Sequence, residues 1–103
     1  MTGVVQVFTK DKRFRRAVAK LVARFAMMQD EVVCIVIGPS IEYLDLRYRQ
    51  QRSLTAIARQ LHCSQRTLQR CHISRGHEFL YHELQSAAPD LARLFRLCIE
   101  QPN

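Results

Sequence analysis

Apolar residues recur at helical intervals along most of this chain, and this spacing constrains the fold more than any other feature. Between residues 10 and 26 they return at three- and four-residue steps, which predicts an amphipathic helix capped by Thr9 or Asp11. From Pro39 onward the same spacing predicts five further helices. They are expected at residues 40–51, 53–61, 64–75, around 79–84 and from Pro89 onward, with Ser40, Ser53 and Ser64 as N-caps and Gly76 as an interruption.

Two β-branched runs flank the first predicted helix. Val4–Phe8 is typical of a strand, and Glu31–Ile37, which ends at Gly38, is typical of a strand buried on both faces. The expected fold class is therefore α+β and mostly α, with a β-α-β unit over residues 1–38 and a helical bundle over residues 39–103. Two strands leave their edges open, so we predict a homodimer built through this unit, or a C-terminal helix that folds over the sheet.

Length and apolar content favour one small domain away from membranes. The chain has 103 residues and 12.0 kDa, and its longest apolar run, Val32–Ile37, is far shorter than the roughly 20 residues of a membrane-spanning helix. Its N-terminal residues lack the pattern of a secretory signal. We therefore expect a cytoplasmic protein with reduced cysteines and no membrane contact.

Basic residues outnumber acidic ones and gather in one stretch. Sixteen Lys and Arg against nine Asp and Glu give a net charge of +7. No acidic residue lies between Leu46 and His77, where seven arginines fall: Arg47, Arg49, Arg52, Arg59, Arg66, Arg70 and Arg75. Such a stretch favours a polyanionic partner, and the alternative is an ordinary solvated basic face.

Catalytic and metal-binding signatures are missing from the sequence. The four cysteines (Cys34, Cys63, Cys71, Cys98) form no CxxC pair, and with the four histidines they show no zinc-finger spacing. There is no glycine-rich phosphate loop and no nucleophile elbow. We therefore expect no enzyme activity, no metal and no cofactor.

The stretch from Ser53 to His72 has the spacing of a helix-turn-helix. Ala58 is small where the two helices must cross, and Leu68 returns to the same core from the second helix. His62 stands at the turn, where a glycine is common, and so requires a left-handed or relaxed backbone. Together with the acid-free surroundings, this pattern predicts a DNA-binding motif.

Leu54, Ala58, Leu61, Ser64 and the run Thr67-Leu68-Gln69-Arg70, followed by Gly76 and Phe79, resemble the first helix-turn-helix of AraC-type transcriptional regulators. The resemblance covers residues 40–85. The family has two such units, whereas this chain has room for one, and His72 stands where the family has Phe or Leu. The resemblance therefore implies weak binding by a monomer or a dimer that restores two half-sites.

Carried over position by position, the resemblance implies contacts of Arg66, Gln69 and Arg70 with base edges in the major groove of double-stranded DNA. The candidates for DNA backbone contacts are Ser64, Gln65, Arg47, Arg49, Arg52 and Arg75. Two alternatives remain open. The helical hairpin is a protein–protein interaction module, or the basic helix Lys10–Arg24 binds nucleic acid nonspecifically or an anionic membrane face.

Overall fold

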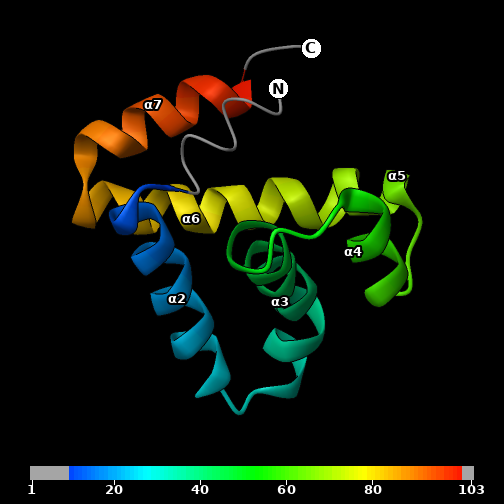
Figure 1. Ribbon diagram of the computed structural model, residues 1–103. Helices are drawn as coiled ribbons and strands as arrows, with labels where there is room; N and C mark the ends of the chain where they lie inside the picture. Colours follow the sequence, from blue (N-terminus) through cyan, green and yellow to red (C-terminus); the bar gives the residue numbers. More distant parts are fainter. Residues whose placement is uncertain (1–9, 101–103) are drawn as a thin grey trace.

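The computed structural model describes residues 10–100, and all regular structure in that range is helical (Figure 1). Two of the helices contain wider π-helical segments that continue them without a break. The elements are α2 (Lys12–Ala26), α3 (Glu31–Leu44) with the π-helical η1 (Asp45–Arg49), α4 (Leu54–Gln60), α5 (Gln65–Thr67) with the π-helical η2 (Leu68–Ile73) and α6 (Ser74–Ala87), and α7 (Pro89–Glu100). Within the described range the chain is therefore an all-α globule of five helices.

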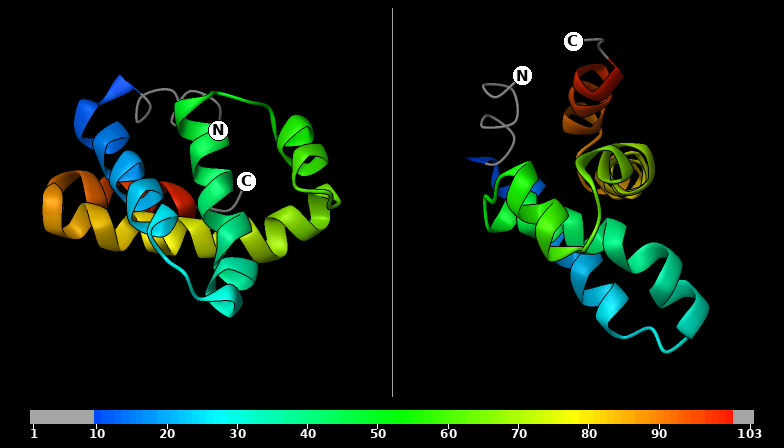
Figure 2. Two further views of the ribbon diagram at one scale, coloured as in Figure 1. Left: turned by 90° about the horizontal axis from the view of Figure 1, so that it is seen from below. Right: turned by 90° about the vertical axis from the view of Figure 1, so that its right-hand side faces the viewer.

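Helix α6 forms the centre of this globule. Helix α7 packs along one side of it, and α2 and α3 cross its other side (Figures 1 and 2). The short helices α4 and α5 lie together at one end of the molecule, away from the turn that joins α2 to α3. The buried residues of α2, α3, α6 and α7 meet in one continuous core.

The predicted β-α-β unit is wrong. Residues 31–37 belong to helix α3, and the other expected strand, Val4–Phe8, lies outside the described residues. Asp30 caps α3, because its side chain accepts a hydrogen bond from the backbone N–H of Val33 at 3.1 Å. A β-branched residue costs a helix well under about 1 kcal/mol, so capping and packing readily outweigh strand propensity. The open sheet edges behind the predicted dimer are therefore absent from residues 10–100.

Helix α3 also continues through Pro39, where the sequence predicted a boundary and a new helix capped by Ser40. Proline has no N–H to donate, so α3 loses one internal hydrogen bond there. The carbonyl that loses this bond is that of Ile35, and at the next residue the guanidinium of Arg75 on α6 donates to the carbonyl of Val36 at 2.8 Å. Ser40 is fully buried instead of standing at a helix start. Packing against α6 thus stabilises a helix that the local sequence interrupts.

Gly76 does not end a helix, because it lies inside the continuous helix 65–87 where α6 crosses α3. A Cβ atom at this position would lie 2.9 Å from the carbonyl oxygen of Ser40 and 3.4 Å from Leu44. Real Cβ atoms do not approach a backbone oxygen that closely. The glycine therefore permits the close crossing of the two helices.

Replacing Gly76 with alanine should lower the free energy of unfolding by about 1–2 kcal/mol. Overpacking costs roughly 1–3 kcal/mol, and the better helix propensity of alanine returns at most about 1 kcal/mol. Urea unfolding followed by circular dichroism measures the change. Ser74→Ala, at an exposed position of the same helix, is the matched control and should be close to neutral. A stabilised Gly76→Ala protein would mean that α3 and α6 are not in close contact here.

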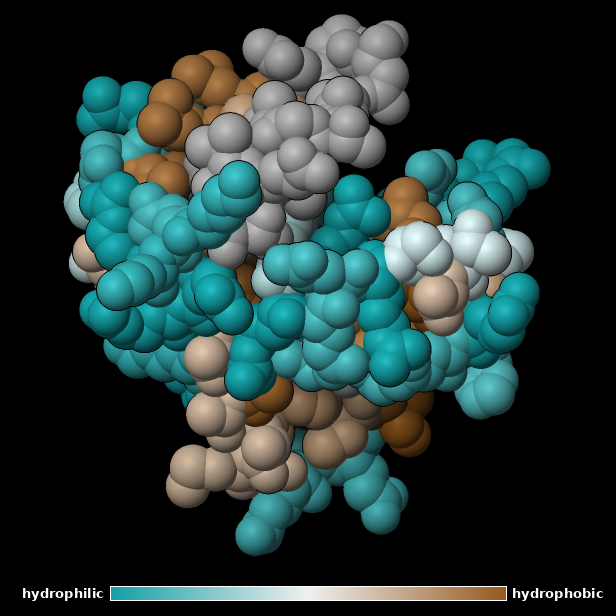
Figure 3. Space-filling view, in the orientation of Figure 1, coloured by the Kyte–Doolittle hydropathy of each residue, from teal (hydrophilic) through white to brown (hydrophobic). Residues whose placement is uncertain are grey.

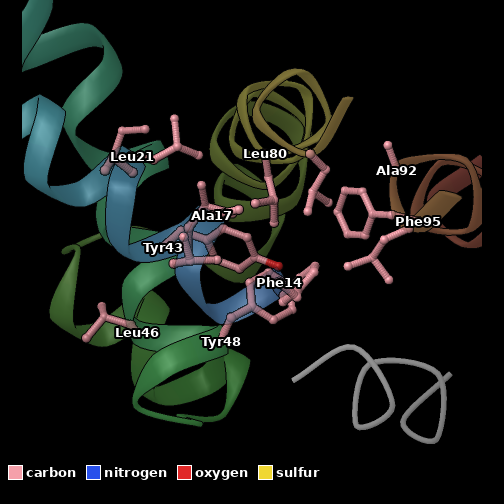
Figure 4. Packing of buried hydrophobic residues seen from close by; sticks show 14 of the residues in the cluster. Phe14, Ala17, Leu21, Tyr43, Leu46, Tyr48, Leu80, Ala92 and Phe95 are labelled. Atoms are coloured by element: carbon pink, nitrogen blue, oxygen red, sulfur yellow. The ribbon is translucent and has the colours of Figure 1, made fainter. Parts of the chain in front are cut away.

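Aromatic rings from four helical elements meet in the core (Figure 4). The ring of Phe14 on α2 lies edge-on to that of Tyr48 at 5.1 Å and tilted against that of Phe95 on α7 at 5.6 Å. His77 on α6 shares a hydrogen bond with the hydroxyl of Tyr48 at 2.8 Å and lies 3.4 Å from that of Tyr43. This cluster joins α2, α3, α6 and α7 at one point.

Candidate nucleic-acid interface

Both helices of the predicted helix-turn-helix begin at the expected serine caps. The Ser53 hydroxyl accepts a hydrogen bond from the backbone N–H of Ala56 at 3.2 Å, and Ser64 accepts one from Thr67 at 3.1 Å. Ala58 and Leu68 are both buried, as the spacing predicted. The two serine caps and these two buried positions are therefore confirmed.

The turn of the unit has the backbone that the sequence required. His62 adopts a left-handed conformation with φ of 57°, which confirms the expectation for this non-glycine residue. The backbone N–H of Cys63 donates to the carbonyl of Ala58 at 3.0 Å. Across the turn, the amide of Gln65 donates to the hydroxyl of Thr55 on α4 at 2.8 Å. These bonds fix the position of α4 relative to the start of the following helix.

The three predicted base-contact residues lie together on the exposed surface of the helix that begins at Gln65. Arg66, Gln69 and Arg70 follow the three- and four-residue spacing of one helix face, whereas Leu68 points into the core. Within residues 10–100, none of the three makes a side-chain hydrogen bond or ion pair. The π-helical turn η2 exposes Gln69, Arg70 and Cys71 in succession. The side-chain donor groups of Arg66, Gln69 and Arg70 are therefore exposed to solvent.

The predicted backbone contacts are mostly engaged within the protein. The hydroxyl of Ser64 caps its own helix, and the amide of Gln65 bonds to Thr55 on α4. Arg49 pairs with Asp45 at 3.1 Å, and Arg75 holds the carbonyl of Val36. Arg52 is exposed, and its one side-chain contact with the described residues is a long 3.4 Å hydrogen bond to the side chain of Gln50.

Arg47 is half-buried and lies beside the aromatic cluster instead of on the open surface. Burial raises the pKa of Tyr43 and of Tyr48, and the positive charge of Arg47 opposes that rise. Burial, and then the charge of Arg47, lowers the pKa of His77 to about 4. Arg47 is therefore part of the electrostatic environment of the core.

Arg59 on α4 is an exposed cation that was not among the DNA contacts implied by the resemblance to AraC-type regulators. It makes no side-chain hydrogen bond or ion pair within the described part of the chain. The sequence signal for Arg59 was its place in the stretch without acidic residues.

His72 is half-buried, and its Nδ1 has no hydrogen-bond partner among the described residues. Burial, and then the charge of Arg75, lowers its pKa.

The basic face of α2 is partly used in contacts with other helices. Lys20 and Arg24 reach the buried carboxylate of Glu83 on α6, at 3.6 and 3.1 Å. Arg13 pairs with Asp11 and with Asp90 at the start of α7. These contacts anchor α2 to its neighbours and reduce the charge that its outer face presents.

Two other features are absent from residues 10–100. No group of three His, Cys, Asp or Glu side chains there lies close enough together to hold a metal ion. No helix of the described range is both long and apolar enough to cross a bilayer. Comparisons of the chain with protein-family models, with curated proteins and with solved structures gave no match.

Proposed function

We propose that this chain is a sequence-specific DNA-binding transcriptional regulator, which places the helix beginning at Gln65 in the major groove of double-stranded DNA. The observation that carries the proposal is the exposed, unpaired set Arg66, Gln69 and Arg70 on one face of a helix fixed by Leu68. Arginine can donate two hydrogen bonds to guanine, and glutamine can bond to both N6 and N7 of adenine. The likeness of residues 40–85 to AraC-type regulators supports the same role.

Electrostatics supports binding to a duplex. Residues 47–76 carry seven arginines and no acidic residue, and Arg52 and Arg59 lie exposed near the two-helix unit, on the preceding loop and on α4. Cations that neutralise phosphates release counterions, so affinity should fall steeply as salt rises. The proposal includes no catalytic, metal or cofactor role. It includes the cytoplasmic location that we expect from the sequence.

The test begins with selection of preferred duplexes from a random pool by the purified protein. Fluorescence anisotropy then compares the preferred duplex with a scrambled one over a salt series. Arg70→Ala should weaken binding to the preferred duplex by about 1–3 kcal/mol, or roughly 5- to 150-fold, and relax selectivity at one base pair. Arg93→Ala is the matched control, because Arg93 is an exposed arginine on α7 without a partner among the described residues.

Two results would contradict this proposal. If Arg70→Ala weakened binding to both duplexes equally, Arg70 would contact phosphate and not a base. If the protein bound no duplex even at low salt, DNA would not be its partner, and the protein–protein interaction module would be the better reading of the two-helix unit.

A further inference from the structure

Large apolar side chains are exposed where α2 turns into α3. We call this the hairpin face, and Figure 3 shows hydrophobic surface gathered at this lower end of the molecule. Met27 is 82% exposed, Ile35 75% and Val32 69%, and about half of Met28 and of Val36 is also exposed. Within residues 10–100, the other exposed large apolar residues are Leu94 and Leu97 on α7. A contiguous apolar patch of this kind marks an interaction surface.

An open cavity of about 600 Å³ lies beside these protruding side chains. Both helices of the hairpin line it, with Val22 and Phe25 from α2 and Ile35 and Ile41 from α3. The charged residues of its lining are both acidic, Glu42 and Asp45. The hairpin face thus carries both a projecting methionine, Met27, and a hollow, and a flexible methionine side chain suits an irregular apolar hollow.

The charge of this region differs from that of the rest of the chain. No lysine or arginine lies between Arg24 and Arg47, although the protein carries sixteen of them. The same interval holds four of the nine acidic residues: Asp30, Glu31, Glu42 and Asp45. The nearest cation on α6 is Arg75, which is exposed and bonded to the carbonyl of Val36 at the edge of the face.

We propose that a second copy of this chain covers the hairpin face, in a two-fold symmetric dimer with α3 packed antiparallel against α3 of the other copy. A two-fold interface uses the same patch twice, so a face must complement itself. Here Met27 of each copy projects toward the hollow of the other. An antiparallel pair centred midway between Val32 and Ile35 also brings Glu31 of one copy alongside Val36 and Arg75 of the other, which matches opposite charges.

A second copy fits this face better than an unrelated partner, because the face itself carries both the projecting methionine and the hollow, and both an acidic and a basic group. The exposed stretch of α3 contains no cation to desolvate, and it has Glu31 at one end and the guanidinium of Arg75, bonded to Val36, at the other. One consequence rests on the proposed function. Each copy carries one two-helix unit, so a dimer would present two of them to two half-sites.

Sedimentation equilibrium of the whole chain at micromolar concentration tests this dimer. We expect a concentration-dependent species of twice the 12.0 kDa mass of the chain. Ile35→Glu and Met27→Glu should each weaken association at least tenfold. Circular dichroism should stay unchanged, because both side chains are mostly exposed. Leu97→Glu, at an exposed leucine on α7, is the matched control and should leave association intact.

Ile35→Ser, which adds no charge, repeats the test if Ile35→Glu loses helical content. The proposal is overturned by a 12.0 kDa species at all concentrations, by a dimer that survives both variants, or by equal dissociation in Leu97→Glu. The two proposals fail separately. A dimer that binds no duplex would reject the DNA-binding role alone, and a selective monomer would reject the dimer alone.

Discussion

Phe14→Ala should lower the free energy of unfolding by about 3–5 kcal/mol, the usual cost of emptying a fully buried aromatic position. The ring of Phe14 is completely buried and touches the rings of Tyr48 and Phe95. Removing it opens a cavity where α2, α3 and α7 meet. Small domains have only about 5–15 kcal/mol of stability, so the variant should lose a large part of it and unfold at a clearly lower urea concentration.

Urea and thermal unfolding followed by circular dichroism measure this effect. Phe14→Leu keeps most of the buried volume and should lose less than half as much stability. Phe25→Ala is a matched control, because Phe25 is only partly buried and lines the open cavity between α2 and α3. A loss below about 1 kcal/mol for Phe14→Ala would mean that the aromatic cluster does not hold the helices together.

Acidification should destabilise the fold between about pH 6.5 and pH 4, by up to about 3 kcal/mol. Burial, and then the charge of Arg47, lowers the pKa of His77 to about 4 from its usual 6.5. Between these values the unfolded chain binds a proton at His77 that the folded chain does not. The free energy of unfolding therefore rises with pH through this window and levels off above it.

Urea unfolding at a series of pH values measures this dependence. His77→Gln keeps a group that can bond to the hydroxyl of Tyr48 but does not titrate, so most of the slope should disappear. His72→Gln is the matched control. His72 is only half-buried, and the same variant should leave most of the slope in place. An unchanged slope in His77→Gln would show that the destabilisation comes from other groups. The carboxylates of Asp11 and Asp90, whose pKa values the hydrogen bonds from Arg13 lower, lose their stabilising charge only below this window.

Local sequence signals were sufficient for several helices and for the turn between two of them. Helix α2 begins after Asp11, α4 after Ser53 and α7 at Pro89, as their polar caps and apolar spacing predicted. The left-handed backbone of His62 followed from its place at the turn, where a glycine is common. These features depend on bonds and contacts within a few residues, so they can be predicted from the sequence.

Residues 31–40 show where local signals were insufficient. A β-branched run can be a buried strand or a helix, because its periodicity does not distinguish the two. Pro39 and Gly76 are each typical of a helix boundary, yet both lie inside helices in this fold. The close crossing of α3 and α6 explains this, since it requires a missing side chain at Gly76 and brings Arg75 to the carbonyl of Val36.

The candidate site divides in the same way. Helical spacing by itself determined that Arg66, Gln69 and Arg70 share one exposed face. Only the tertiary structure decided that two other arginines are not freely available, because Arg47 is half-buried beside the aromatic cluster and Arg75 is bonded to the carbonyl of Val36 on α3. It also decided that the apolar residues of α3 form an exposed helix face instead of a sheet. Periodicity determines the direction of a side chain within its helix, whereas its partners depend on which helices pack together.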